Sequence, residues 1–310
     1  MANSKFAKVR KELKGSGYLD DLETSDIYSA LMILGDWTII AMAIAVSYYT
    51  ENIAIYLLSI PVIGARMMAL GVLMHEASHG NLFKKAALNG PLTNLLLAWP
   101  LGRNVTDYKN VHRQHHQYLK QESDTEKPLE AYHEFQFPLS KKKWYTILLS
   151  DIIGINYLKY RLSKVFSRSE IGSAESDKSR FTINRPQVYT TLIAIAVLII
   201  SGFWQEFLLF WLIPYCTWFQ VLLRLHASSE HFAIPTKTGF QTRTLKINPI
   251  EAFFFFPHHM NYHCEHHLYP QVPFRYLPEL HMRLLEEVNY QSNTHLTHGI
   301  KGLFTELTNV

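Results

Sequence analysis

Four apolar segments, each close to the roughly 20 residues that an α-helix needs to cross a bilayer, constrain this chain most. Thr50–Asn52 separates the first two and Trp204–Glu206 separates the last two, so each pair is predicted to form a helical hairpin. A soluble α-helical bundle is the alternative, but two such pairs are unusual in a soluble core. We therefore predict an all-α integral membrane protein in one domain (residues 1–310), with four transmembrane helices at about residues 27–49, 53–74, 187–203 and 207–225.

The charge pattern predicts which side of the membrane holds the polar parts. Basic residues between Lys5 and Lys14 favour a cytoplasmic N-terminus. Two hairpins then leave residues 75–186 and 226–310 in the cytosol, as a helical cap. Within this cap, Trp144–Tyr160 has basic flanks and an apolar middle, which is typical of a helix in the membrane interface. We expect a multi-pass protein of the bacterial inner membrane or an equivalent membrane.

The overall composition excludes two classes. The formal net charge of +4 gives no argument for a nucleic-acid partner. The two cysteines, Cys216 and Cys264, are too few for a disulfide framework. The chemistry of the chain must therefore come from other side chains.

Half of the sixteen histidines lie in three short clusters. Imidazole is neutral at physiological pH and is the commonest metal-ligating side chain. Residues three and four apart share one face of a helix, so each cluster can aim its rings at one point. Eight imidazoles exceed the four ligands of a single zinc ion, so the clusters predict two metal ions. The predicted ligands are His75 and His79, then His112, His115 and His116, and finally His263, His266 and His267.

Other polar residues near these clusters have predicted supporting roles. His231 follows the fourth apolar segment and is a candidate ninth ligand, whereas His226, five residues earlier, would face another way. The remaining histidines that we considered are interpreted as solvated surface residues, namely His133, His281, His295 and His298. Carboxylates interleaved with the ligands are expected to accept imidazole N–H groups. These are Glu76, Asp124, Glu230 and Glu265, and Asn261 is a candidate to hold a metal-bound water.

The nature of the ligands leaves the metal open between zinc, copper, iron and nickel. The ligand count argues against a mononuclear zinc site. Chemistry beside a membrane, in a chain with no nucleophile or phosphate-binding motif, favours redox work on an apolar substrate. Two iron ions are therefore the leading choice, although the paired Glu-x-x-His motifs of soluble di-iron bundles are absent.

At the histidine clusters the chain resembles the membrane fatty acid desaturase superfamily, in the motifs HEASHG, HRQHH and NYHCEHHLYPQVP. The resemblance implies a non-haem di-iron centre on the cytosolic face that activates O₂ with electrons from an external donor. It also implies that the eight cluster histidines and His231 are the ligands. The first motif has three residues between its histidines rather than four, which leaves the substrate open. No His-Pro-Gly-Gly stretch is present, so a ferredoxin or cytochrome b5-type donor would be a separate protein.

Residues in and near the apolar segments suggest how a substrate is held. Trp99, Trp218 and Phe253–Phe256 are expected to line a hydrocarbon tunnel or to pack as ordinary core. Asp36 and Arg66 lie at similar depth in the first two segments, so they can pair with each other. Arg66 can alternatively recognise a carboxylate of the substrate.

Four functions are compatible with these features. The first is a fatty-acyl or lipid desaturase, and the second is a hydroxylase or ketolase acting on a lipid, carotenoid or specialised metabolite. The third, suggested by Arg66, is a desaturase of a small polar metabolite. A non-enzymatic metal-binding or transport protein is the fourth and is disfavoured, because the histidines lie at the ends of the apolar segments rather than at their middle.

Overall fold

A computed structural model describes residues 9–10, 17–170, 185–235 and 239–308. The described part of the chain is mostly helical, and two of its long helices form the predicted first hairpin, α2 (Asp26–Thr50) and α3 (Ile53–His79). The side chain of Ser25 caps the start of α2, and that of Asn52 accepts the first amides of α3. The two caps stand at the predicted boundaries, so the short connection and both helix starts follow from local sequence.

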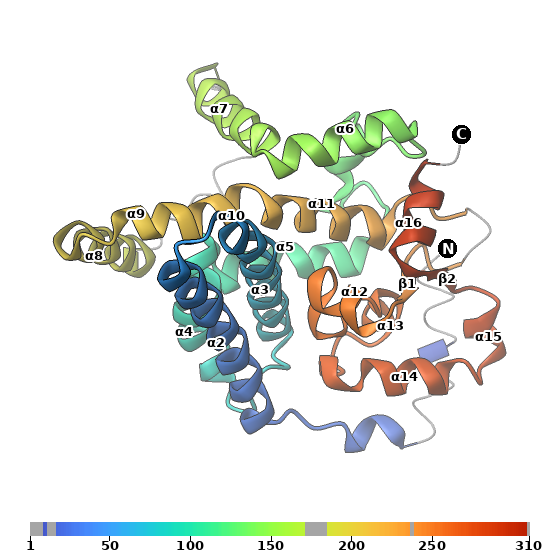
Figure 1. Cartoon of the computed structure of the whole chain (residues 1–310). Coiled ribbons are helices and arrows are strands. Elements are labelled where there is room, and N and C mark those ends of the chain that lie inside the picture. The colour runs from blue at the N-terminus through green and yellow to red at the C-terminus, as the bar shows by residue number, and fades with distance from the viewer. Residues whose placement is uncertain (1–8, 11–16, 171–184, 236–238, 309–310) are drawn as a thin grey trace.

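A third long helix is built from consecutive pieces over residues 204–231. These are α9 (Trp204–Phe207), the π-helical η7 (Leu208–Leu212), α10 (Ile213–Cys216) and α11 (Trp218–His231). Together with α2 and α3 it is long and apolar enough to cross a membrane. Figure 1 shows α11 running across α3, and this crossing brings the C-terminal ends of both helices into the cap.

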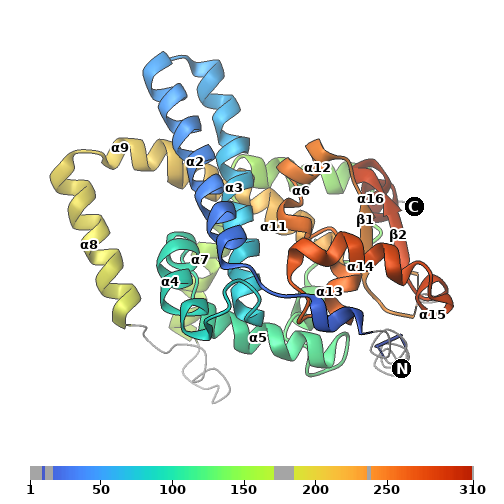
Figure 2. The same ribbon diagram turned by 90° about the horizontal axis from the view of Figure 1, so that it is seen from below.

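The remaining predicted span corresponds to α8 (Arg185–Ser201), which is apolar but has only 17 residues. Figure 2 shows α8 apart from the α2–α3 hairpin, and none of its residues is buried. The number of four spans therefore remains a prediction. The predicted connection at Trp204–Glu206 is wrong, because the chain turns at Gly202 and Phe203 and Trp204 already begins α9.

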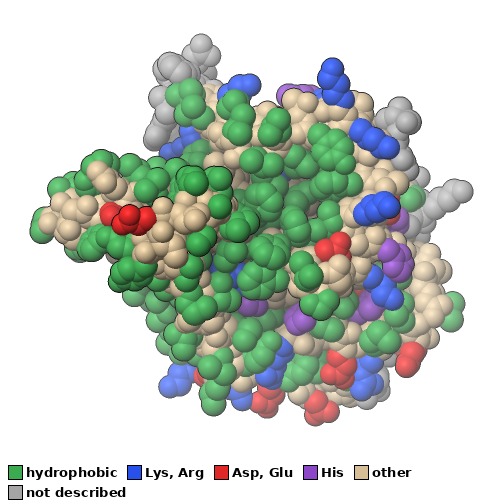
Figure 3. Space-filling view, viewed as in Figure 1, with side chains coloured by type: hydrophobic (Ala, Val, Ile, Leu, Met, Phe, Trp, Pro, Cys, Tyr) green, Lys and Arg blue, Asp and Glu red, His purple; other side chains and the backbone are tan. Residues whose placement is uncertain are grey.

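Exposed apolar side chains mark the membrane-facing part of the molecule. Ile27, Leu34 and Leu58 are each more than 60% exposed on α2 and α3. Figure 3 shows hydrophobic side chains covering the projecting α8–α9 region and the neighbouring centre, whereas charged side chains gather along the lower and right edges. Such a large apolar surface would be unstable in water and is suited to lipid.

The close approach of α3 and α11 depends on Gly64. A Cβ atom on Gly64 would lie 2.9 Å from the Cβ of Trp218 and 3.2 Å from the backbone nitrogen of Phe219. We expect Gly64→Ala to destabilise the protein by about 1–3 kcal/mol, because the helices must move apart. Gly35→Ala is the control, since nothing lies within 4 Å of that position. Thermal unfolding in detergent would measure both, and equal melting temperatures would contradict the expectation.

The cap is built from short helices between and after the long ones. The first part contains η2 (Ala86–Asn89), α4 (Pro91–Thr93), the π-helical η3 (Asn94–Ala98), η4 (Trp99–Leu101), α5 (Val105–Tyr118), η5 (Lys127–Ala131), α6 (Lys141–Ile152) and α7 (Ile155–Glu170). The second part contains α12 (Pro249–Phe254), η8 (Pro257–His259), α13 (His263–Leu268), η9 (Phe274–Tyr276), α14 (Leu277–Leu284), α15 (Val288–Gln291) and α16 (Gly299–Thr308). One further short helix, η1 (Tyr18–Asp21), precedes α2. The predicted interfacial helix is thus two helices, α6 and α7, because the chain takes a left-handed conformation at Gly154.

The prediction of an all-α fold needs one correction. β1 (Arg243–Lys246) and β2 (His295–His298) pair as a two-stranded parallel sheet. Arg243 is buried and anchors this sheet to α11, because its guanidinium donates to the carbonyls of Ser229 and Phe232. The sheet therefore fixes the segment that follows His231 against the rest of the cap.

Candidate metal centre

Four helices converge with all nine predicted histidine ligands. The C-terminal turns of α3 carry His75 and His79, and the last turn of α11 carries His231. α5 and α13 carry the remaining six, which are His112, His115 and His116 on α5 and His263, His266 and His267 on α13. Seven of the nine are buried, and His79 and His116 are half-buried.

The nine imidazoles divide into two groups. In each group one ring nitrogen of every histidine lies within 4.8 Å of those of the other members. The first group contains His75, His79, His112, His116 and His266, and the second contains His115, His231, His263 and His267. The expectation that each cluster aims at one point is therefore wrong for α5 and α13. His112 and His116 share one face of α5, whereas His115 points to the other group, and α13 divides its rings in the same manner.

The orientation of His115 and His231 is suited to a cation bound between them. Nδ1 of His115 lies 2.8 Å from a carboxylate oxygen of Asp124, and Nδ1 of His231 lies 3.1 Å from the carbonyl of Gln241. Both partners only accept hydrogen bonds, so both Nδ1 atoms carry the proton of a neutral ring. The two Nε2 lone pairs then face each other across 2.9 Å, which is repulsive unless a positive ion binds both.

Further ring nitrogens face the inside of the groups. In the first group Nε2 of His112 lies 2.8 Å from Nε2 of His75 and 2.9 Å from Nε2 of His116. Nε2 of His79, in the first group, and of His267, in the second, are buried and have no hydrogen-bond partner among the described residues. An unpaired buried polar atom costs about 1–3 kcal/mol, and a bound metal would remove that cost. The residues therefore fit two metal ions.

The electrostatic environment keeps these rings ready to bind a metal. Burial, together with repulsion from neighbouring imidazoles, lowers the pKa of His112 well below its usual value. The same causes lower the pKa of His266 and His267. Burial opposes the ionisation of Asp124, but hydrogen bonds from His115 and from two backbone amides outweigh it and hold the Asp124 pKa below its usual value. Neutral imidazoles beside an ionised carboxylate are the forms that metal binding needs.

The predicted supporting carboxylates take different positions. Glu76 lies 3.2 Å from Nδ1 of His75 and also accepts the Phe274 amide, so it orients a predicted ligand. Asp124 does the same for His115, as described above. Glu230 lies 3.7 Å from Nδ1 of His263, slightly beyond hydrogen-bond distance. These three carboxylates therefore surround the two groups from outside.

Two of the predicted supporting residues do not contact the metal-site imidazoles. Glu265 accepts from Tyr290 and Thr244 and pairs with His281 instead. The side chain of Asn261 donates to the carbonyl of Leu245, at 2.8 Å, and so braces β1. Both side chains stabilise the cap around α13 rather than touching a predicted ligand.

The other histidines include one misjudged residue. His281 was interpreted as a solvated surface residue, but it is only 2% exposed, so that interpretation is wrong. His281 is buried because it pairs with the buried carboxylate of Glu265, 16 positions earlier, and no local sequence pattern links the two residues. His133 and His298 are exposed, and His295 is half-buried against Glu306. His226 bonds the Phe255 carbonyl through Nε2 and belongs to neither group.

Asp36 and Arg66 form the predicted pair, at 3.0 Å, and both are at most 5% exposed. The second oxygen of Asp36 lies 2.7 Å from Nε2 of His258, a residue that the sequence analysis missed. Arg66 also donates to the Phe253 carbonyl, and its guanidinium lies 4.0 Å from the centre of the Phe253 ring. The buried charges are thus held between α2, α3, α12 and η8.

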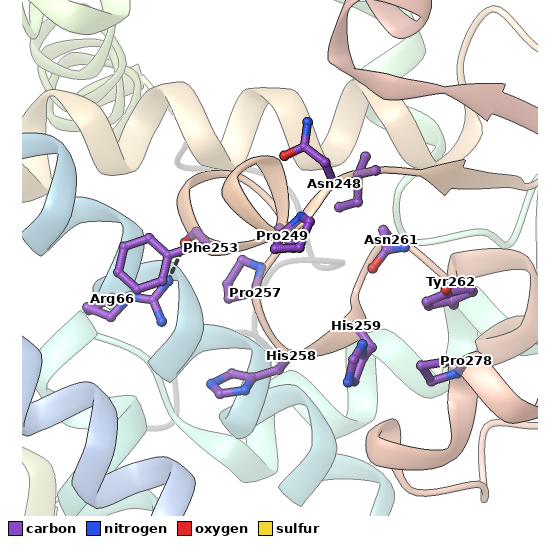
Figure 4. Close-up of a pocket in the computed structure, with 12 residues that line it drawn as sticks. Arg66, Asn248, Pro249, Phe253, Pro257, His258, His259, Asn261, Tyr262 and Pro278 are labelled. Atoms are coloured by element: carbon purple, nitrogen blue, oxygen red, sulfur yellow. Dashed lines mark hydrogen bonds between the residues drawn. The ribbon is translucent and has the colours of Figure 1, made fainter.

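A cavity of about 470 Å³ lies beside this pair, and Figure 4 shows the side chains that surround it. Arg66 and Phe253 form one end, and Asn261 and Tyr262, just before the third histidine cluster, form the other. Of the predicted tunnel residues Phe253 lines this cavity, whereas Trp218 packs against Gly64 and Phe255. Trp99 is half-buried on η4, with an unpaired indole N–H among the described residues.

Comparison with known proteins agrees with this arrangement. The chain is 28% identical over 305 residues to the dihydrorhizobitoxine desaturase of Bradyrhizobium elkanii. The aligned region covers 94% of this chain and 84% of that protein. Residues 51–299 match the family described as fatty acid desaturase, and this range contains all nine histidines of the two groups. Three membrane-length helices among the described residues, the paired histidine groups and this match over most of the chain show that the protein is a membrane oxidoreductase belonging to the fatty acid desaturase family.

Proposed function

We propose that this protein is an O₂-dependent di-iron desaturase that inserts a C=C bond into a fatty-acyl or lipid substrate. The observation that supports the proposal most directly is the pair of buried imidazole groups, each with an Nε2 atom that lacks a partner among the described residues. The groups lie where α3 and α11 end, so a substrate dissolved in the membrane can reach them. The proposal places the groups on the cytosolic side of a multi-pass fold.

When bound, the two irons supply the oxidising power that removes hydrogen from unactivated carbon. The overall reaction takes two hydrogen atoms from adjacent carbons. With two electrons from a donor and two protons, it reduces O₂ to two water molecules. An external ferredoxin or cytochrome b5-type protein is the proposed donor. The chain's own contribution is to hold the imidazoles, through Asp124 and Glu76, and to keep bulk water from them by burial.

A second candidate is desaturation of a small polar metabolite. The named relative is a desaturase of dihydrorhizobitoxine, as its name states. The cavity beside Arg66 also carries polar side chains, among them His258, His259 and Asn248. A hydroxylase or ketolase uses the same metal ligands, so the product must distinguish these reactions.

The test compares cells that express the wild-type protein with cells that express His263→Ala. Lipids and polar metabolites are extracted from both and analysed by mass spectrometry. A desaturase predicts wild-type products that have lost two hydrogens, whereas a hydroxylase or ketolase predicts products that have gained oxygen. Loss of hydrogens in a lipid supports the first candidate, and loss in a polar metabolite supports the second. If the two profiles are identical while the wild-type protein is iron-loaded, the proposed function is wrong.

A further inference from the structure

Two carboxylates that do not belong to the three histidine clusters of the sequence lie close to the second group of histidines. Glu126 lies just before η5, and Glu230 lies on α11 next to His231. One oxygen of each and a ring nitrogen of His231 lie within 4.8 Å of one another. Glu126 is also 3.7 Å from Nε2 of His115, the nitrogen that faces the inside of the group. The two carboxylates therefore differ, because the ring nitrogens within 4 Å of Glu230 are the outward-facing Nδ1 of His263, at 3.7 Å, and Nδ1 of His226, which belongs to neither group, at 3.9 Å.

The position of Glu126 is fixed by the same contacts that orient His115. Its backbone amide donates to Asp124, at 2.9 Å, and that carboxylate oxygen also accepts from Nδ1 of His115. The hydroxyl of Thr125 donates to the Val111 carbonyl on α5. A short loop is therefore tied to α5, and it directs Glu126 to the metal-facing side of the ring.

In the part of the chain that the structure describes, no lysine or arginine lies within ion-pair distance of Glu126. The nearby Lys120 pairs with Glu130, at 2.6 Å, and Lys127 pairs with Glu122. Among the described residues only His115 lies within ion-pair distance of Glu126. A small cavity of about 10 Å³ lies here, with room for one small ion or a water, and its lining includes His115, Glu126 and His231 as well as Lys120 and Lys127. Because both lysines are paired with other carboxylates, Glu126 remains available to a metal ion in this space.

The numbers of ligands also leave a place for a carboxylate. The first group offers five imidazoles and the second only four. Two ligands that each lie about 2.1 Å from one ion are about 3.0–4.2 Å apart, depending on the angle between them. The 3.7 Å between Glu126 and Nε2 of His115 lies within that range. Nε2 of His267, buried and without a partner among the described residues, faces the same group.

We infer that Glu126 is a carboxylate ligand of the metal in the second group. The inference rests on the metal centre of the proposed function. It makes the two ions chemically different, since one has five imidazoles and the other has four imidazoles and an anionic oxygen. An anionic oxygen ligand stabilises the ferric state more than imidazole does, so the iron of the second group becomes the easier one to oxidise.

The test uses Glu126→Gln, which keeps the shape of the side chain and removes its charge. Wild-type protein loaded with ⁵⁷Fe is expected to show two different Mössbauer doublets of equal area. In Glu126→Gln one doublet shifts or disappears, with a loss of affinity for that iron of about tenfold or more, and the other is retained. Glu122→Gln is the matched control, because that side chain lies in the same loop and is 91% exposed.

The outcomes separate this inference from the proposed function. Unchanged doublets and two irons per chain in Glu126→Gln would overturn the role of Glu126 and leave the function intact. A wild-type protein that binds no iron would instead overturn the function. If Glu126→Gln does not fold, Glu126→Asp replaces it, since it retains a carboxylate on a shorter side chain. That variant is expected to keep two irons with one shifted doublet, and an unshifted doublet would contradict the inference.

Discussion

Replacing His267 with alanine is expected to lower the iron content to at most one ion per chain and to reduce turnover by about 100-fold or more. His267 is one of four imidazoles in the second group, and its Nε2 has no other partner among the described residues. Its loss leaves three imidazoles and an open coordination position. Elemental analysis of the purified protein gives the iron content, and mass spectrometry of the product gives the turnover.

The control for this change is His133→Ala, because His133 is exposed and belongs to neither group. It should retain the wild-type iron content and activity. If His267→Ala bound two irons and turned over normally, His267 would not be a ligand. The imidazoles of the second group would then pack together without binding a metal.

Arg66→Met is expected to destabilise the protein by about 3–5 kcal/mol, because it leaves Asp36 buried without its guanidinium. Asp36 is 3% exposed, and its other oxygen lies 2.7 Å from Nε2 of His258. The double variant Arg66→Met with Asp36→Leu removes both charges and should be more stable than the single variant. Thermal unfolding in detergent measures all three proteins. A folded Arg66→Met of wild-type stability with weakened substrate binding would instead assign Arg66 to recognition.

The sequence predicted the parts of the structure that are determined locally. The hairpin of α2 and α3 follows from two apolar runs and the capping residue Asn52. The three- and four-residue spacing of the histidines predicted which residues lie in the two imidazole groups, but not the division of α5 and α13 between them. His231 was predicted because it follows directly after an apolar segment, where the ends of α3 and α11 meet.

The parts that could not be predicted depend on contacts between distant residues. His258 and Asp36 are 222 positions apart, and no local pattern connects them. The four-residue strands β1 and β2 are too short to show alternation, and their pairing joins residues near 243 and 295. Glu126 lies two residues after Asp124, which was predicted to support a ligand, so the same acidic stretch could have suggested Glu126 as a further candidate. Only the folded loop shows which of its carboxylates faces the imidazoles.

If two ions bind as proposed, the division of α5 and α13 between the two groups couples their uptake. Each of these two helices carries imidazoles of both groups, so an ion that binds one group also positions imidazoles of the other. By thermodynamic reciprocity the second ion must tighten the first by the same factor. Uptake by the wild-type protein, in which both proposed sites are intact, is therefore expected to be cooperative.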